Sequence, residues 1–261
     1  MECITCPSTR PFSHKGTSSL EQCMTLHGNL YVSNQINRIT QFSPDANTHT
    51  IFVDKDGMLD EPWDMTFLNN GLMLVCNHYS SSVELYGTDS EHKSRFIEVD
   101  TPIGILMFPN SENKVAVASY TDSVVYVYDL TGSVEQNING TVTINRRTDR
   151  HIIFTTQPLS SSDGGPYYLT FGSDMSEVLI TSHVGKVVRR CISAECASDR
   201  NKVMVYSGND DSDLNGIISI PSNGEYLVAD RWGTVYRCSL TAPTNQLLQD
   251  CEVFTSDMYD P

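Results

Sequence analysis

The sequence predicts an all-β fold: a β-propeller built from repeated four-stranded antiparallel blades. Three observations predict it. Apolar and polar residues alternate with a period of two, turn residues recur at intervals of roughly 8–12 residues, and one strand–turn–strand pattern repeats along the chain. An array of immunoglobulin-like sandwiches is the rival all-β fold, but it would not explain the repeated Pro-apolar strand start.

Each copy of the repeat has the same order of parts. An apolar strand meets a turn rich in Gly, Asn or Ser, and a second strand then ends in a small or polar residue. A third, alternating strand and a looser fourth strand follow. The dipeptides Asn70-Gly71 and Asn223-Gly224 supply the positive φ angle that tight hairpins need. Four clear copies and a weaker first one begin at Pro62, Pro102, Pro166, Asn215 and His27.

The copies predict a propeller domain over residues 20–261, with blades near 20–54, 61–100, 101–156, 165–208 and 214–261. The stretch 136–162 lengthens one interval between copies. It contains the apolar strand 151–154, and we expect the stretch as a whole to form a loop that elaborates one blade edge. The second strands of the five copies end at Asn34, Asn77, Ser119, Ser182 and Asp230.

Composition and net charge argue for a folded chain and against nucleic-acid and membrane partners. The 261 residues are 39% hydrophobic and 19% charged, which suits a folded chain with a sizeable core. A formal net charge of −15 repels phosphate backbones and anionic lipids, so we expect no nucleic-acid partner. No apolar run approaches the roughly 18 residues that span a bilayer, so we expect no membrane insertion within this segment. The first residues do not form a signal peptide, and a secretion signal would have to lie upstream of Met1.

The eight cysteines indicate disulfides, although their pairing cannot be read from the sequence. Cys238 closes one apolar run and Cys251 opens the next, so neighbouring strands of one blade would bring them within disulfide reach. Cys191 holds in its segment the place that Cys238 holds in its own, and Cys196 follows at once. Cys76 ends an apolar run and is predicted to be a buried free thiol. Two further cysteines expected in disulfides are Cys6 and Cys23.

Two family resemblances add to this interpretation. The segment Asn223–Arg237, with Asp230 after Tyr226-Leu-Val-Ala229, resembles NHL-type repeats and the related gluconolactonase-like six-bladed propellers. Because that family usually closes with six blades and five are visible here, the resemblance implies a segment cut from a longer protein. Alternatively, the N-terminal stretch completes the ring, or the array stays open.

The N-terminal residues 1–23 resemble the ephrin-receptor-like cysteine-rich repeat. The match runs from Cys3-x-x-Cys6-Pro7 through Ser13 and Gly16 to Cys23. Such repeats occur in large extracellular modular proteins, so the resemblance implies an extracellular location. A zinc site is the rival explanation of the Cys-x-x-Cys motif, but it would need a second pair of ligands.

The ends of the second strands are the candidate cation site. Gluconolactonase-like enzymes hold a divalent cation with Glu, Asn and Asp from different blades, and the matching residues here are Asn34, Asn77 and Asp230. Asp64 and Asp163, near strand starts, could add charge. The alternative, which we favour, is that these side chains cap strand ends by hydrogen bonds.

Other residues are weaker candidates for chemistry. His78 and His183 follow second-strand ends, but a serine beside a histidine is not a triad without a positioned acid. Trp63 and Trp232 could stack on sugars, although packing between blades is the interpretation we favour. The acidic run Asn209–Asp213 is expected to be a solvated loop.

Together these observations predict a non-catalytic extracellular module with a structural or adhesive role, including packing in a fibre or matrix. Its expected partners are other protein subunits, flanking domains of the same chain, and glycans. No cofactor is expected, with calcium as the alternative, and Asn139 in Asn139-Gly140-Thr141 is the candidate glycosylation site. Two alternatives are a calcium-dependent lactonase-like hydrolase and an intracellular NHL-type interaction platform.

Overall fold

The computed structural model describes most of the chain between Asn29 and Thr255. The described ranges are 29–34, 36–44, 47–55, 57–68, 70–108, 114–131, 134–136, 142–144, 150–155, 165–171, 177–182, 187–192, 202–207, 214–220, 224–230, 234–239 and 251–255. The regular elements in these ranges are all strands. Within them, no helix has the length and apolar character needed to cross a membrane.

The strands form five sheets and one separate hairpin. The first sheet contains β1 (Leu30–Asn34), β2 (Arg38–Phe42) and β3 (His49–Val53); the second contains β4 (Pro62–Phe67), β5 (Met73–Asn77), β6 (Ser82–Tyr86) and β7 (His92–Glu98). The third contains β8 (Pro102–Met107), β9 (Lys114–Ser119), β10 (Val124–Asp129) and β13 (Arg150–Thr155). The fourth contains β14 (Pro166–Phe171), β15 (Glu177–Ser182), β16 (Val187–Ile192) and β17 (Lys202–Ser207); the fifth contains β18 (Leu214–Ile220), β19 (Glu225–Asp230), β20 (Val235–Ser239) and β21 (Glu252–Thr255).

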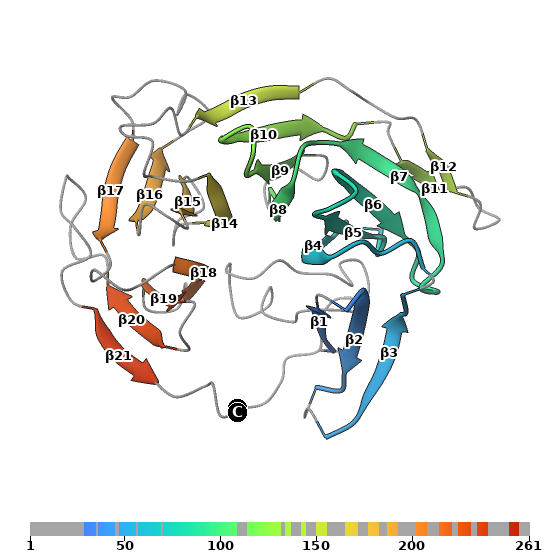
Figure 1. Ribbon diagram of the computed structural model, residues 1–261, viewed down its shortest axis with the longest axis horizontal. Coiled ribbons are helices and arrows are strands. Elements are labelled where there is room, and N and C mark those ends of the chain that lie inside the picture. The colour runs from blue at the N-terminus through green and yellow to red at the C-terminus, as the bar shows by residue number, and fades with distance from the viewer. Residues whose placement is uncertain are drawn as a thin grey trace. The chain divides into compact units, whose positions relative to one another are not determined.

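Each four-stranded sheet is an antiparallel meander in which the strands lie side by side in chain order (Figure 1). Among the described residues the first sheet has three strands, which form the antiparallel order β1-β2-β3. Within the stretch 136–162, the apolar strand expected at 151–154 is confirmed as β13, and the other described residues are strand where a loop was expected. That region begins with the hairpin β11 (Val134–Gln136) and β12 (Val142–Ile144), after which β13 pairs with β10 as the outer strand of the third sheet.

The chain divides into two compact units, residues 1–117 with 127–151 and residues 118–126 with 152–261. In the first unit, one sheet packs face to face on the next. Ile39 and Val53 of the first sheet are buried against Met73, Val75 and Tyr86 of the second. Because both faces of the second sheet are covered, every residue of β5 and β6 is buried.

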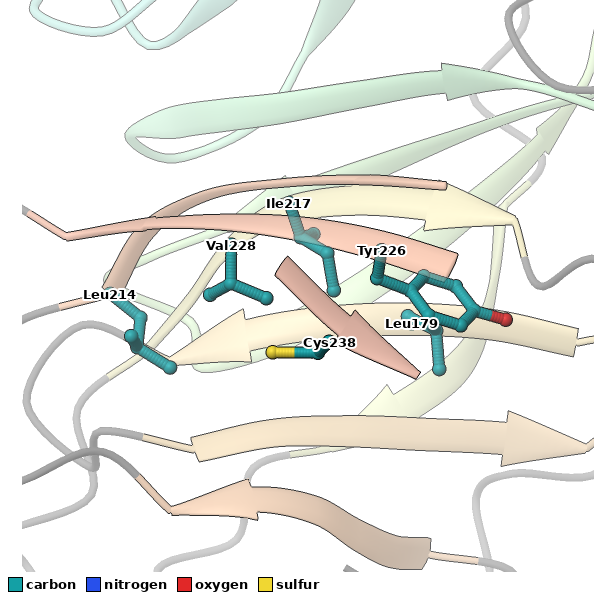
Figure 2. Packing of buried hydrophobic residues seen from close by; sticks show 6 residues of the cluster. All are labelled: Leu179, Leu214, Ile217, Tyr226, Val228 and Cys238. Carbon is teal, nitrogen blue, oxygen red and sulfur yellow. The ribbon is translucent and has the colours of Figure 1, made fainter. Parts of the chain in front are cut away.

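The second unit has the same kind of core. Leu179 of the fourth sheet packs against five buried residues of the fifth (Figure 2), which are Leu214, Ile217, Tyr226, Val228 and Cys238. Tyr226 and Val228 of β19 both belong to this core, because residues two apart in a strand point to the same face of the sheet.

Two predicted tight turns have the backbone that their glycines allow. Gly71 and Gly224 have φ angles of 88° and 68°. A Cβ atom added at Gly224 would meet nothing within 4 Å, so the turn requires glycine for its backbone angle and not for lack of space.

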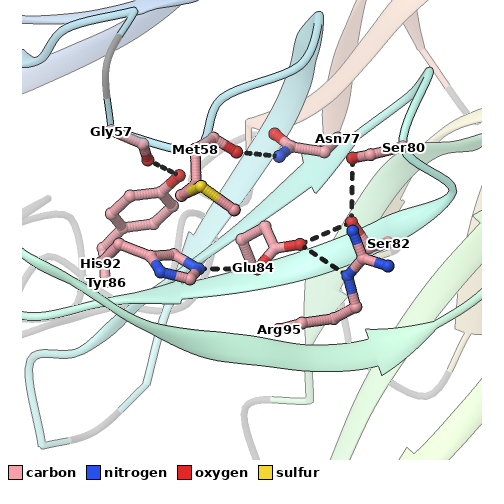
Figure 3. A network of polar contacts seen from close by, with 9 residues as sticks. All are labelled: Gly57, Met58, Asn77, Ser80, Ser82, Glu84, Tyr86, His92 and Arg95. Carbon is pink, nitrogen blue, oxygen red and sulfur yellow. Dashed lines mark hydrogen bonds and ion pairs between the residues drawn. The ribbon is translucent and has the colours of Figure 1, made fainter.

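The second sheet contains a buried carboxylate, Glu84, in its third strand. The Glu84 side chain is 2% exposed and accepts hydrogen bonds from Ser82 Oγ at 2.7 Å and Arg95 Nε at 3.2 Å. His92 Nε2 lies 2.8 Å from its other oxygen. Figure 3 shows Glu84 at the centre of these contacts, which join it to Ser82 on the same strand, β6, and to His92 and Arg95 on β7. Buried charges are tolerated in proteins when they are paired and hydrogen-bonded in this way.

Replacing Glu84 with glutamine should therefore lower the free energy of unfolding by about 2 kcal/mol, because Arg95 and His92 lose their anionic partner. Glu91→Gln is the matched control, since Glu91 is exposed and pairs with Lys93 at the surface; it should change stability by less than about 0.5 kcal/mol. Urea denaturation of the three proteins checks this. Equal effects of the two substitutions would contradict the proposed importance of the buried network.

Burial also raises the pKa of two groups near this network. Cys76 has a free, fully buried thiol, as the sequence predicts, and burial followed by the negative charge of Asp64 raises its pKa well above the ordinary value of 9.0. The pKa of the Tyr86 hydroxyl is likewise raised above 10.0 by burial and by Glu84. The Tyr86 hydroxyl donates a hydrogen bond to the carbonyl of Gly57 at 2.6 Å.

The free energy of unfolding should consequently fall as the pH rises above roughly 9. In that range the unfolded chain loses protons that the folded chain retains at these two groups, and each such group can contribute up to about 1.4 kcal/mol per pH unit. Urea titrations between pH 8 and 11 would measure the slope. Tyr86→Phe should make the slope shallower above roughly pH 10, whereas Tyr79→Phe, at an exposed position, should leave it unchanged. An identical slope in wild type and Tyr86→Phe would contradict this assignment.

Candidate functional site

The residues that end the second strands fall in both units. Asn34 and Asn77 end β1 and β5 in the first unit, and Ser119 and Ser182 end β9 and β15 in the second. The backbone of Asp230 ends β19, but its side chain lies outside the described residues. The arrangement is therefore described most fully in the first unit.

Hydrogen bonds tie together three turns at this end of the first unit. Asn37 Oδ1 accepts a hydrogen bond from the Glu61 amide at 2.6 Å, and the Glu61 carbonyl accepts one from the His78 amide at 3.1 Å. Asn77 Nδ2 donates to the Met58 carbonyl at 2.7 Å (Figure 3). We call these three segments, Ile36–Asn37, Gly57–Glu61 and His78–Ser81, the turn cluster.

The turn cluster contains four residues other than glycine with a left-handed backbone. Their φ angles are 60° at Asn37, 64° at Met58, 52° at Glu61 and 50° at Ser81. Only asparagine among these types adopts this region readily, and for the others it costs on the order of 1–2 kcal/mol per residue. Non-glycine residues in such conformations concentrate at functional sites. Sequence reasoning missed Met58 and Glu61, because neither residue type carries a local signal for this conformation.

Two aromatic rings of the turn cluster, His78 and Tyr79, lie near a third, that of Trp63. The ring centroid of His78 lies 5.6 Å from that of Trp63 and 5.5 Å from that of Tyr79. Ser33 Oγ donates to the Trp63 carbonyl at 2.7 Å, which ties β1 to β4. Trp63 is half-buried where the first sheet adjoins the second, so its position suits packing between blades, while Trp232 lies outside the described residues.

The turn cluster also exposes large apolar side chains. Ile36 is 69% exposed, Met58 60% and Tyr79 72%. Leu59, next to Met58, is 5% exposed and belongs to the core of the first unit. In the segment Gly57–Glu61, the side chain of Leu59 is therefore buried in the core, while that of Met58 is exposed to solvent.

The amide oxygens at this end fit part of the predicted cation site. Asn34 Oδ1 and Asn77 Oδ1 are both buried and have no hydrogen-bond partner among the described residues, so both can accept a further bond. They are neutral, however, and Asp64 is already engaged: its oxygens accept the amides of Met65 and Ile105, each at 2.9 Å. The described residues contain no group of three His, Cys, Asp or Glu side chains that could hold a metal ion.

The described polar groups are also not arranged as a catalytic triad. In a triad the histidine bridges the nucleophile and the acid. Here Ser82 and His92 both contact the acid, Glu84, on its two oxygens. Ser182 is 1% exposed at the end of β15, and His183 lies outside the described residues.

In the second unit, the polar side chains at the ends of the second strands serve local structure. Ser119 Oγ accepts a hydrogen bond from the Asp122 amide at 3.3 Å, and Tyr126 donates to Asp122 Oδ2 at 2.9 Å. Thr181 Oγ1 accepts the Tyr168 amide at 2.9 Å. The first two contacts stabilise the turn that follows β9, and the third holds the start of β14 against β15.

A disulfide joins Cys238 of β20 to Cys251, which immediately precedes β21. These are the two cysteines that the sequence places on neighbouring strands. The side chains of the remaining predicted positions lie outside the described residues. They are the disulfide candidates Cys6, Cys23, Cys191 and Cys196, the glycosylation candidate Asn139 and the additional cation ligand Asp163.

No protein-family model matches the chain, and no curated protein sequence does. Solved structures do match. A chain of a nidogen/laminin complex is 14% identical with a TM-score of 0.63, covering 82% of this chain and 73% of that one. Virginiamycin B lyase from Staphylococcus aureus is 12% identical with a TM-score of 0.58, covering 96% and 86%. A streptogramin B lyase is 10% identical with a TM-score of 0.53, covering 92% and 69%.

At these identities the likeness shows the fold alone. Together with the antiparallel four-stranded sheets, it shows that the chain is a β-propeller. The specific resemblances to NHL-type and gluconolactonase-like repeats and to the cysteine-rich repeat stay predictions. In total 1039 chains of solved structures match, so sharing this fold does not select one function.

Proposed function

We propose that the chain is a non-catalytic propeller module of an extracellular protein, which acts by binding or packing against other proteins. The observation that carries the proposal is the disulfide between Cys238 and Cys251. Disulfides persist in oxidising compartments and are rare in the cytosol. The bond therefore weighs against the alternative of an intracellular interaction platform, whose cysteines would stay reduced.

The contacts of the described polar residues support a non-catalytic role. Glu84, Asp64 and Asn77 each hold together two segments of the second sheet or its neighbours, by hydrogen bonds of 2.7–3.2 Å. A catalytic acid or base needs access to a substrate, and Glu84 is 2% exposed. The similarity to a chain of a nidogen/laminin complex supports protein binding in an extracellular assembly, as in a fibre or matrix.

A non-reducing peptide map by mass spectrometry tests the location. We expect a linked Cys238–Cys251 peptide and a glycan on Asn139 in protein secreted from eukaryotic cells. Cys76 is the internal control, because its thiol should be alkylated only after unfolding. The double variant Cys238→Ser and Cys251→Ser should lose about 3 kcal/mol of stability, given the separation of 13 residues.

Other outcomes of the same map would contradict the proposal. Free thiols at Cys238 and Cys251 together with an unmodified Asn139 would place the protein in a reducing compartment. That result would favour the intracellular interaction platform.

The two unpartnered amide oxygens, Asn34 Oδ1 and Asn77 Oδ1, favour a second candidate function, the calcium-dependent lactonase-like hydrolase. Asn34 and Asn77 would supply oxygen ligands to the cation, which would polarise the ester carbonyl of a lactone. A hard cation needs several oxygen ligands and more than one negative charge in most sites, and the described residues supply two neutral ones.

Thermal unfolding with Ca²⁺ or with a chelator separates the two candidates. The binding-module proposal expects the same melting temperature in both. The hydrolase expects Ca²⁺ at ten times its dissociation constant to stabilise the protein by about 1.4 kcal/mol. Asn77→Ala should abolish that shift, whereas Asn70→Ala, at an exposed turn, should retain it. A shift with this pattern, accompanied by lactone hydrolysis that chelation removes, would replace the proposal of a binding module.

A further inference from the structure

We infer, on the basis of the proposed binding function, that the turn cluster is the docking surface for a protein segment that presents apolar side chains beside lysine or arginine. The surface consists of the exposed side chains of Ile36, Met58 and Tyr79 and a rim of carboxylates, Asp60, Glu61 and Asp100. Three properties of this surface support the inference: its exposed apolar side chains, its rigid backbone and its negative charge.

Exposed apolar side chains concentrate at the turn cluster. The described residues include seven exposed large hydrophobic side chains: Val32, Ile36, Ile51, Met58, Tyr79, Val253 and Phe254. Three of the seven, including the two most exposed, belong to these hydrogen-bonded turns. Single exposed apolar residues are ordinary, but a cluster of them rimmed by polar groups is typical of a protein interaction site.

The backbone that carries these side chains is held in place before any partner binds. Asn37 and Asn77 hold the 57–61 segment through the Glu61 amide and the Met58 carbonyl. The side chain of Leu59, in the same segment, is buried in the core of the first unit and anchors the segment there. A surface that is already ordered loses little conformational entropy on binding, so more of the contact energy appears as affinity.

The charge of the surface selects the partner. The segments 57–61, 78–81 and 99–101 contain Asp60, Glu61 and Asp100 and no lysine or arginine. Among the described residues, Asp60 and Glu61 have no ion pair, and Asp100 accepts a hydrogen bond from Ser81 Oγ at 3.1 Å. Two cations lie near these segments in the chain. Arg38 is paired with Asp54 at 3.1 Å, and Lys55 follows Asp54 directly and precedes Asp56. A partner with lysine or arginine beside its apolar side chains complements this rim, and an acidic partner is repelled by it.

Three substitutions test the surface without disturbing the core. Ile36→Ser and Tyr79→Ser remove exposed apolar side chains. Met58→Gly removes another and leaves a residue that adopts the left-handed backbone at no steric cost, so the turn should be retained. Ile51→Ser is the matched control, because Ile51 is 50% exposed on β3, outside the turn cluster.

The probe is a synthetic array of dodecapeptides that carry two leucine or tyrosine residues flanked by lysine and arginine. Matched arrays replace the basic residues with aspartate and glutamate, or with serine. Binding of the full chain is measured on the array, and the affected amides are located by NMR shift changes with the best peptide. An array of neutral oligosaccharides is measured in parallel.

We expect the basic peptides to bind at least about tenfold more tightly than the acidic and serine sets, with shift changes at residues 36–37, 57–61 and 78–81. The triple variant Ile36→Ser, Met58→Gly and Tyr79→Ser should lose at least about tenfold in affinity, while Ile51→Ser keeps it. Glu61→Gln should weaken binding more at low salt than at high salt.

Several outcomes would overturn the inference. These are equal binding of acidic and basic peptides, shift changes confined to other residues, equal loss in Ile51→Ser, binding of oligosaccharides instead of peptides, or no peptide binding. None of these outcomes affects the non-reducing peptide map, which reports the Cys238–Cys251 disulfide and the glycan on Asn139. The docking surface can therefore be refuted while the proposal of an extracellular module is retained. Free thiols in that map would refute the module whatever the peptides do.

Discussion

The rest of this structure depends on the face-to-face packing of sheets within each unit. In the first unit, β5 and β6 are buried at every position because apolar side chains of neighbouring sheets cover both of their faces. Polar side chains within those strands therefore need partners inside the protein, and the side chains of this sheet that reach solvent lie in the outer strand β7 and in the turns. This constraint explains why the polar second-strand ends and the turn cluster occupy the same end of the first unit.

Glu84 is the exception that shows how strict the constraint is. A carboxylate in the middle of a buried strand is tolerated because a serine on its own strand and two residues of the outer strand supply donors to both of its oxygens. The same contacts favour the observed pairing of β6 with β7, since a shift of one residue would turn His92 and Arg95 to the opposite face. Asn77 meets the requirement for hydrogen-bond partners only in part. Its amide nitrogen donates to the Met58 carbonyl, while its amide oxygen has no hydrogen-bond partner among the described residues.

Much of the fold could be predicted because its signals are local. Alternation and Asn-Gly turns locate the strands, and the segments of Cys238 and Cys251 are strands that pair in one sheet. The apolar run 151–154 lies inside the predicted blade 101–156 and forms its outer strand, β13. The hairpin β11–β12 that interrupts this blade could not be predicted, because its strands are only three residues long. The turn cluster could not be predicted, since the left-handed backbones of Met58 and Glu61 are held by Asn77 and Asn37, which lie 19 and 24 residues away in the chain.

These left-handed turns bear directly on function. If folding were the only requirement, glycine or asparagine at position 58 would meet it at lower cost, because a methionine in this conformation is strained. The strain is tolerated because Leu59 and Asn77 hold the segment on both sides, and its visible result is an apolar side chain held outward. An observed strain of this kind is grounds for a functional hypothesis. Since the same fold occurs in two lyases and in a nidogen/laminin complex, the function of this propeller must be sought in such turns and not in its sheets.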